Sequence, residues 1–436
     1  MLRKILIGSI FGSIFISSYV FFKSPFEAYA SYLVFVVFFP IFFVKFGIPK
    51  WPVLLFLPLL ISGLTYCAIG LNTYSLFFKI FIGFFSSVLF YHYVIQLFQF
   101  DLRLLFKYYM KGAYIVTVIG IIQIVSYLVG FTPGYDFHWI FNKWSLAPGG
   151  VGIRMNSIFS EPAYFAAVIA PAFFVSVYNL FRREEYFINR FQSIVIAGAY
   201  FLTFSSIGIL AIFAAIVLFL INLGFVKYSF FMIPLLFIFF NYAYKNVPEF
   251  TERYDGTIEI FSSGNYKSWD IHGSSFVLYN NYHVALENFK RNPIMGTGLG
   301  SHPIAFDKYS YTNLVGAVTI DFNKVDANSM LLRLMSETGL YGLILVLFML
   351  FKCWVYKGNS VQDDTWLMSN AISLVIILYL LRQGHYFLNG FPFFLWMYYY
   401  LAKEHWGELR ELAENKKEEY VIPEPTPTLV PDRRTW

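Results

Sequence analysis

Apolar stretches of about 20 residues recur along most of the chain, and each is long enough to cross a hydrocarbon core of roughly 30 Å. Hydrophobic residues make up 58% of the 436-residue sequence, and charged residues only 13%. A soluble domain carries roughly 25% charged residues, so this composition excludes a soluble enzyme. The sequence therefore predicts an all-α, polytopic membrane protein.

Sliding windows of about 20 residues predict roughly 12 membrane helices. The predicted spans are 4–22, 26–46, 51–70, 74–99, 105–130, 161–181, 187–204, 207–225, 228–245, 328–351, 366–383 and 386–402. Lysines and arginines of the short loops fall on one side of the membrane, and cytoplasmic loops are the ones that retain such residues. Both chain termini are therefore predicted to be cytoplasmic.

The predicted spans divide the chain into four parts. Residues 1–245 hold the first nine spans with an external loop at 131–160, and residues 246–327 form a larger external loop with an expected helix at 275–290. Residues 328–402 hold the last three spans, and residues 403–436 form a cytoplasmic tail. Loops of such length are usually functional, so the two external loops are the places to look for a site.

The charge pattern and the cysteines exclude several kinds of partner. The formal net charge is +6, but basic residues are scattered between apolar runs, so no nucleic-acid partner is predicted. Cys67 and Cys353 lie far apart and form neither a disulfide framework nor a cysteine metal site. No HExxH, paired CxxC or DxD motif is present, and the sequence predicts neither a metal nor another cofactor.

A first polar cluster lies at the external end of the sixth predicted span and includes Arg154, Asn156 and Glu161. Ser160 can cap the following helix, and Glu161 would lie in its first turn, where the helix dipole favours a carboxylate. A well-formed helix start is one explanation. It does not explain why Arg154 and Asn156 lie at the same boundary, so we interpret the cluster as a candidate site.

A second cluster covers residues 292–302, includes Gly296, Gly298 and His302, and directly follows Arg291. Glycines let backbone N–H groups approach a ligand closely, and a structural turn is the alternative explanation.

A third cluster lies in the external hairpin between the last two predicted spans and contains Arg382 and His385. Lys79, near the outer end of the fourth span, could join it in an anion site. Arg382 could instead be an interfacial residue whose charged end extends towards water.

External cations and a single well-placed carboxylate suit a substrate with pyrophosphate at the outer membrane surface. Guanidinium groups bind phosphate oxygens through strong, charge-assisted hydrogen bonds. A lipid-linked glycan has this chemistry.

Four motifs occur in order along roughly residues 150–345. They read Arg154-x-Asn-Ser-Ile-Phe-x-Glu161-Pro162, then Leu-Thr-Phe-Ser-Ser at 202–206, then Asn-Pro-Ile-Met-Gly-Thr-Gly-Leu-Gly at 292–300, then Asn-Ser-Met-Leu and Glu-Thr-Gly-Leu-Tyr-Gly within 328–342. Together they resemble the O-antigen polymerase and O-antigen ligase superfamily.

The resemblance implies a GT-C-like glycosyltransferase of the bacterial inner (cytoplasmic) membrane, with its active site facing the periplasm. Its donor would be an undecaprenyl-pyrophosphate-linked oligosaccharide, used without a metal. By analogy Arg154, Arg291 and Arg382 would contact the donor pyrophosphate. Ligases of the superfamily carry a histidine just before the helix that ends in Glu-Thr-Gly, whereas this chain has Asp326-Ala327-Asn328 there, which favours a polymerase.

The expected reaction is therefore the inverting transfer of a growing polysaccharide from undecaprenyl pyrophosphate to a lipid-linked repeat unit. Glu161 is the candidate general base, with His302 and His385 as second candidates. The residues expected to bind substrate are Arg154, Asn156, Arg291, Arg382, Lys79, Gly296 and Gly298.

Two alternatives remain. An O-antigen ligase would move the glycan to lipid A core or protein, and a lipid-linked oligosaccharide flippase would transport it without chemistry. A transporter usually places ionisable residues near the bilayer midplane, whereas here they gather at the outer boundary. The partners implied are the lipid-linked oligosaccharide, membrane lipid, and flippase and chain-length regulator proteins.

Overall fold

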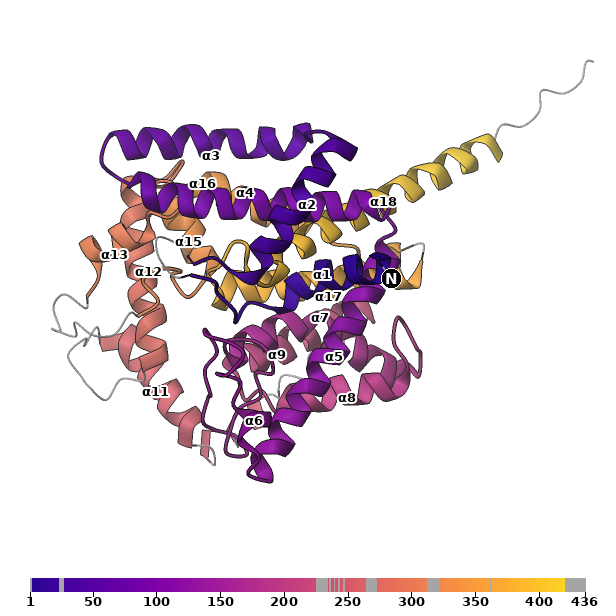
Figure 1. Cartoon of the computed structure of the whole chain (residues 1–436), viewed down its shortest axis with the longest axis horizontal. Helices are drawn as coiled ribbons and strands as arrows, with labels where there is room; N and C mark the ends of the chain where they lie inside the picture. Colours follow the sequence, from indigo (N-terminus) through magenta and orange to yellow (C-terminus); the bar gives the residue numbers. More distant parts are fainter. Residues whose placement is uncertain are drawn as a thin grey trace, which may run out of the picture.

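The structure is a computed structural model that describes residues 2–22, 27–224, 248–263, 273–311, 322–360 and 362–419, and residues 234, 237, 238, 240, 241, 244 and 245. The described residues form helices joined by loops, with two isolated β-bridges (Figure 1). The helices are α1 Leu2–Phe15, α2 Ala30–Phe46, α3 Lys50–Ala68, α4 Tyr74–Leu97, α5 Leu102–Leu128, α6 Thr132–Tyr135, α7 Pro162–Arg182, α8 Arg190–Phe201, α9 Ser206–Asn222, α11 Pro248–Ser263, α12 Gly273–Arg291, α13 His302–Tyr309, α15 Met330–Glu337, α16 Gly339–Lys352, α17 Asp363–Arg382 and α18 Phe391–Glu419. The all-α prediction is confirmed for this part of the chain.

Five of the described helices are long and apolar enough to cross a membrane, namely α3, α4, α5, α7 and α17. Shorter apolar helices occur within α1, α2, α9 and α16. These lengths and compositions indicate a helical membrane protein. The predicted span 228–245 lies largely outside the described residues.

Helix α7 is the centre of the bundle and packs against α8, α9 and α17. Its buried face is rich in alanine, and Ala166, Ala167, Ala170 and Ala172 are fully buried. Lipid tails are as apolar as leucine, so membrane helices associate through close packing, which small side chains permit. The alanine-rich sequence at residues 163–172 therefore favours a position for α7 in the interior of the bundle. This packing also holds the N-terminus of α7 in place.

The structure corrects the single span predicted at 328–351, which is broken into α15 and α16 at Thr338 and Gly339. Gly339 has a φ of 59°, a conformation that L side chains rarely adopt. A Cβ there would lie 2.5 Å from the carbonyl oxygen of Pro293, because the turn after α12 packs on this break. The break lets α15 turn its polar residues into the protein interior.

The first predicted span, 4–22, is also wrong in its second half, because α1 ends at Phe15. The following residues are extended, and Val20 forms a β-bridge with Tyr29. The Asn142 side chain binds the backbone N–H of Val20 at 2.9 Å and its carbonyl oxygen at 2.5 Å. This extended segment therefore joins the 131–160 loop instead of continuing as a helix.

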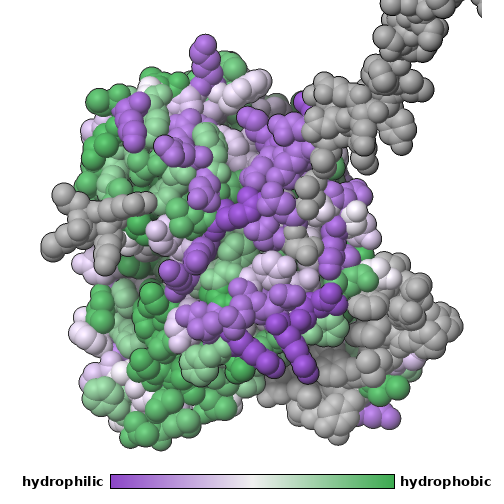
Figure 2. Space-filling model, turned by 90° about the vertical axis from the view of Figure 1, so that its right-hand side faces the viewer, coloured by the Kyte–Doolittle hydropathy of each residue, from purple (hydrophilic) through white to green (hydrophobic). Residues whose placement is uncertain are grey.

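The two ends of the bundle differ. Helices α11, α12 and α13 lie at one end, opposite the N-terminus and the long helix α18 (Figure 1). Figure 2 views the molecule from the end near the N-terminus, where hydrophilic side chains gather across the centre and hydrophobic ones lie towards the left margin. Helix α12 confirms the helix predicted at 275–290.

The predicted orientation places Lys308 of α13 outside the cell and Glu184, which follows α7, in the cytoplasm. Both residues are exposed, and the native Cys67 and Cys353 are buried. An impermeant maleimide should therefore label Lys308→Cys in intact spheroplasts, and should label Glu184→Cys only after lysis. The reverse pattern would contradict the predicted orientation and the predicted periplasmic location of the site.

Candidate active site

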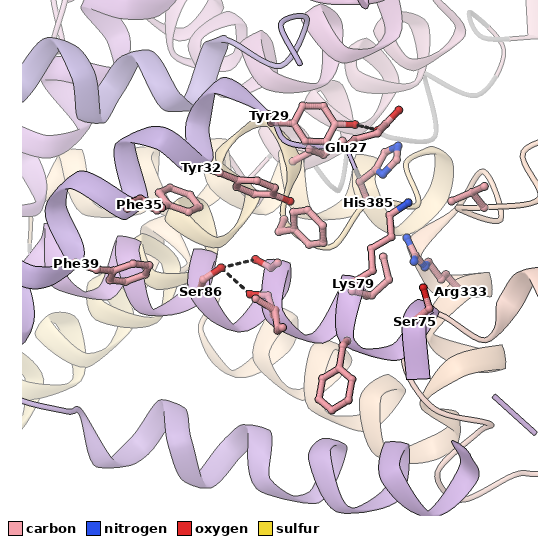
Figure 3. A pocket seen from close by; sticks show the side chains of 18 residues that line it. Glu27, Tyr29, Tyr32, Phe35, Phe39, Ser75, Lys79, Ser86, Arg333 and His385 are labelled. Carbon is pink, nitrogen blue, oxygen red and sulfur yellow. Dashed lines mark hydrogen bonds between the residues drawn. The ribbon is translucent and has the colours of Figure 1, made fainter. Parts of the chain in front are cut away.

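A cavity of about 600 Å³ lies between α2, α4 and the loops at one end of these helices (Figure 3). This volume is within the roughly 300–1,000 Å³ range of small-molecule sites. One part of its wall is apolar, formed by Phe35, Val36 and Phe39 of α2 and Phe78 and Ile82 of α4. We call this space the amphipathic cavity, because its other end is charged.

The charged end of the amphipathic cavity is formed by Lys79 of α4, Arg333 of α15 and His385 of the α17–α18 hairpin. The carboxylate of Glu27 also lines this end, and it pairs with Lys143 at 2.6 Å. Figure 3 shows their nitrogen-bearing ends directed towards a common region, with Phe35 and Phe39 farther along the cavity. Lys79 is exposed and forms no hydrogen bond or ion pair with any described residue. Its ammonium group is therefore available to an anion.

Arg333 is held in place by contacts on several sides. Its side chain is 2% exposed, and its Nε lies 3.0 Å from Oε1 of Glu337, one helical turn along α15. Its Nη1 donates to the carbonyl oxygen of Gly384 at 2.8 Å, and the guanidinium lies 4.5 Å from the centre of the Tyr386 ring. Nη2 of Arg333 has no hydrogen-bond partner among the described residues. One edge of the guanidinium group is therefore free to bind a ligand in the cavity.

His385 is oriented by two partners at Nε2. Oδ2 of Asp326 lies 3.1 Å away, and the hydroxyl of Tyr164 in α7 lies 2.8 Å away. Burial raises the pKa of Asp326, but the hydrogen bond and charge of His385 outweigh it and hold this pKa at about 2. Asp326 is therefore ionised.

A second cavity of about 450 Å³ lies against the N-terminus of α7. Its ionisable lining residues are Arg154 and Glu161, and the rest of the wall is formed by small polar and apolar side chains: Ser145, Leu146, Ala147, Pro148, Pro162, Ala163, Ser205 and Ser206. We call it the Arg154 cavity. The structure thus brings the first two sequence motifs together at one site.

Glu161 is the N-cap residue of α7 and not a member of its first turn, so that detail of the sequence interpretation is wrong. Its side chain forms no capping hydrogen bond, and Ser160 does not take the N-cap position. The carboxylate is instead exposed to the Arg154 cavity. Burial by the surrounding protein, and then the negative charge of Asp326, raise the pKa of Glu161, and the nearby His385, Lys143 and Arg154 only partly oppose this shift.

The two cavities are neighbours across the first turn of α7. Glu161 faces the Arg154 cavity, and Tyr164, three residues later, binds the His385 that lines the amphipathic cavity. One helical turn is about 5.4 Å long. Glu161 also interacts electrostatically with Asp326 and His385, so its carboxylate lies near the charged end of the amphipathic cavity.

The other predicted site residues lie elsewhere. Asn156 is fully buried, and its amide binds Gln123 and the carbonyl oxygens of Ser145 and Phe159, so it shapes the loop. Arg291 lies at the surface at the end of α12, over the Tyr309 ring at 5.1 Å. Arg382 is half-buried at the end of α17 and lines neither cavity.

His302 is fully buried, and its Nε2 lies 3.0 Å from Oδ1 of Asn281. Burial and the neighbouring charge of Arg333 lower its pKa to about 3, so the imidazole is neutral at physiological pH. It lines neither cavity, and we give it no place in the proposed site.

Gly296 and Gly298 serve close backbone packing. A Cβ on Gly296 would lie 2.4 Å from the backbone carbon of Glu337, and one on Gly298 would lie 3.3 Å from the Cα of Gly63 in α3. Both glycines have positive φ angles, 61° and 92°. The third motif thus packs against the C-terminal end of α15, and neither glycine lines a cavity.

Sequence reasoning missed Arg333, Glu337 and Asp326. A usable signal was present, because Arg333 and Glu337 lie four residues apart inside an apolar run. Ionisable residues within a membrane segment are functional candidates by default, and this spacing places them on one helix face. The contact of Asp326 with His385 joins distant segments and has no local signal.

The described residues contain no group of three or more His, Cys, Asp or Glu side chains that could hold a metal ion. No protein-family model matches this chain, and a search of curated proteins finds no match.

Proposed function

We propose that the protein is a polysaccharide polymerase of the bacterial inner membrane. It would move a growing glycan from undecaprenyl pyrophosphate to the nonreducing sugar of a lipid-linked repeat unit. We further propose that the fold is GT-C-like and has roughly 12 membrane spans, the number that hydropathy predicts. The site would lie on the periplasmic side.

The amphipathic cavity is the observation that carries this proposal. A polyprenyl pyrophosphate has a long apolar chain and a compact dianionic or more highly charged head. Phenylalanine side chains of α2 and α4 line one part of the cavity, and Lys79, Arg333 and His385 line the other, together with Glu27, whose charge is paired with Lys143. Placing cations beside the leaving pyrophosphate stabilises the charge that develops on it in the transition state.

In the proposed reaction, Glu161 takes the proton of the acceptor hydroxyl. The acceptor oxygen then forms a bond to the anomeric carbon of the donor glycan, and the bond from that carbon to the pyrophosphate oxygen breaks. The electron pair leaves with undecaprenyl pyrophosphate, beside Lys79 and Arg333. Attack from the side opposite the leaving group inverts the anomeric centre, and no covalent enzyme intermediate forms.

The arrangement gives less support to a flippase. Glu161 precedes the first residue of α7, His385 follows the end of α17, and Lys79 lies in the second turn of α4. These groups gather at one end of the helices, whereas a transporter needs a site near the midplane that opens to both sides.

Binding of undecaprenyl pyrophosphate to the purified protein in detergent tests the donor site. Lys79→Gln should weaken binding by about tenfold or more, because a charge-assisted hydrogen bond is worth roughly 1.5–3 kcal/mol. Ser86→Phe should also weaken it, because Ser86 lines the apolar part. Thr65→Phe, on an exposed face of α3 away from the cavity, is the matched control.

Inorganic pyrophosphate and undecaprenol separate the contributions of head and chain. Lys79→Gln should affect the first ligand and Ser86→Phe the second. Equal affinity of undecaprenyl pyrophosphate for wild type and both variants would refute the assignment of the amphipathic cavity.

A further inference from the structure

We propose that the Arg154 cavity binds the acceptor sugar and that Arg154 pairs with a carboxylate on that sugar. The repeat unit would then contain an acidic sugar of the uronic acid type. This inference rests on the proposed function, because it assigns the second substrate of the same reaction. It also moves Arg154 from the donor pyrophosphate, where the family resemblance placed it, to the acceptor.

The position of the base decides which substrate occupies this cavity. A general base must lie within hydrogen-bond reach of the hydroxyl that it deprotonates. Glu161 lines the Arg154 cavity and not the amphipathic cavity, and the reverse holds for Lys79 and Arg333. The attacking hydroxyl is therefore assigned to the Arg154 cavity, and the leaving pyrophosphate to the amphipathic cavity.

Arg154 is held by its loop but has no partner for its charge. Pro148 and Ile153 form a β-bridge, and the backbone N–H of Arg154 donates to Ala147 at 2.9 Å. A Cβ on Gly149 would lie 3.3 Å from the Arg154 stem, so the glycine leaves room for that side chain. The loop therefore holds the Arg154 side chain at the wall of the Arg154 cavity.

Within the described part of the chain, the guanidinium of Arg154 forms no ion pair or hydrogen bond, and its Nε is buried without a partner. A buried charged donor that lacks a partner is unfavourable. Glu161 faces the same cavity and does not pair with Arg154. A ligand that brings an acceptor to Arg154 would remove this cost.

The remaining wall suits a sugar with a single negative charge better than a pyrophosphate. Ser145, Ser205 and Ser206 supply neutral polar groups, and Leu146 and Pro148 supply apolar surface for the faces of a sugar ring. One guanidinium matches one carboxylate through two parallel hydrogen bonds. A pyrophosphate carries more charge and finds two further cations in the amphipathic cavity.

The test compares D-glucuronate with D-glucose, its neutral counterpart, as ligands of the full-length protein in detergent by ligand-observed NMR. We expect glucuronate to bind wild type, to lose tenfold or more in affinity in Arg154→Gln, and to bind Lys79→Gln as it binds wild type. Glucose should bind more weakly and respond little to Arg154→Gln. Arg154→Gln should keep its Tm, because the side chain loses no protein partner.

Undecaprenyl pyrophosphate is the second ligand on the same variants, and it separates failure of this inference from failure of the proposed function. We expect Arg154→Gln to bind it as wild type does. Equal glucuronate binding by wild type and Arg154→Gln would overturn the inference while the donor site stands. Loss of undecaprenyl pyrophosphate binding in Arg154→Gln would also overturn it, by returning Arg154 to the donor. Failure of wild type to bind undecaprenyl pyrophosphate would refute the proposed function itself.

Discussion

Glu161→Gln is expected to reduce turnover by something on the order of 10²–10⁴-fold, the usual contribution of a positioned general base. The amide has the shape of the carboxyl group but cannot accept the hydroxyl proton. Donor binding should be unchanged, because Glu161 does not line the amphipathic cavity. Glu161→Asp should retain intermediate activity, since it keeps a carboxylate at a greater distance.

The same substitution should leave Tm unchanged or raise it. The pKa of Glu161 is raised in the folded protein, so the fold disfavours the ionised form. Such a group lowers the free energy of unfolding at pH values above its unfolded pKa, and the neutral amide removes that effect. A carboxylate that merely stabilised a helix start would give the opposite result, a loss of up to about 1 kcal/mol.

Turnover should also fall as the pH decreases, with a midpoint above the ordinary glutamate value of 4.5, because protonated Glu161 cannot act as a base. Rates, Tm and donor binding measured on purified wild type, Glu161→Gln and the exposed control Glu184→Gln would check all three expectations. Near-normal turnover of Glu161→Gln would contradict this role and make His385 the next candidate base.

Arg333→Met is expected to lower the free energy of unfolding by about 3–5 kcal/mol, the usual cost of breaking a buried ion pair by removing one partner. Glu337 is fully buried, and it would lose the guanidinium that lies 3.0 Å away. The double variant Arg333→Met/Glu337→Met should recover much of this loss, because a buried ion pair and a well-packed apolar pair are often similar in stability.

Donor binding distinguishes a structural role of Arg333 from a functional one. The double variant should fold and still bind undecaprenyl pyrophosphate at least tenfold more weakly than wild type, since one charged hydrogen bond is worth about 1.5–3 kcal/mol. Denaturant unfolding and binding assays on the single and double variants measure both quantities. Full donor affinity in a stable double variant would limit Arg333 to holding Glu337 and Tyr386.

Hydrophobic periodicity predicted the helical class and the positions of most helices, because the hydrophobicity of the local sequence determines spans such as 74–99 and 161–181. The prediction failed where contacts between distant segments outweigh local hydrophobicity. The run at 328–351 is apolar enough for one helix, yet the turn containing Pro293 packs on Gly339 and breaks it. The end of α1 at Phe15 similarly reflects contacts with the distant loop that contains Asn142.

The candidate site was predictable only in part. Glu161, Arg154, Lys79 and His385 were recognised from the sequence as ionisable residues at the outer boundary of predicted spans. Their division between two cavities depends on how α4, α7 and the α17–α18 hairpin pack, which no single segment encodes.

The most direct test of the polymerase proposal is an assay of the purified protein with one substrate, the undecaprenyl-pyrophosphate-linked repeat unit of its host. A polymerase should convert it alone into a ladder of longer lipid-linked glycans and release undecaprenyl pyrophosphate, and Glu161→Gln should give no ladder in the same time. Absence of a ladder with wild type would contradict the proposal. Transfer only after lipid A core or protein is added would instead indicate a ligase, and movement across proteoliposomes without new bonds would indicate a flippase.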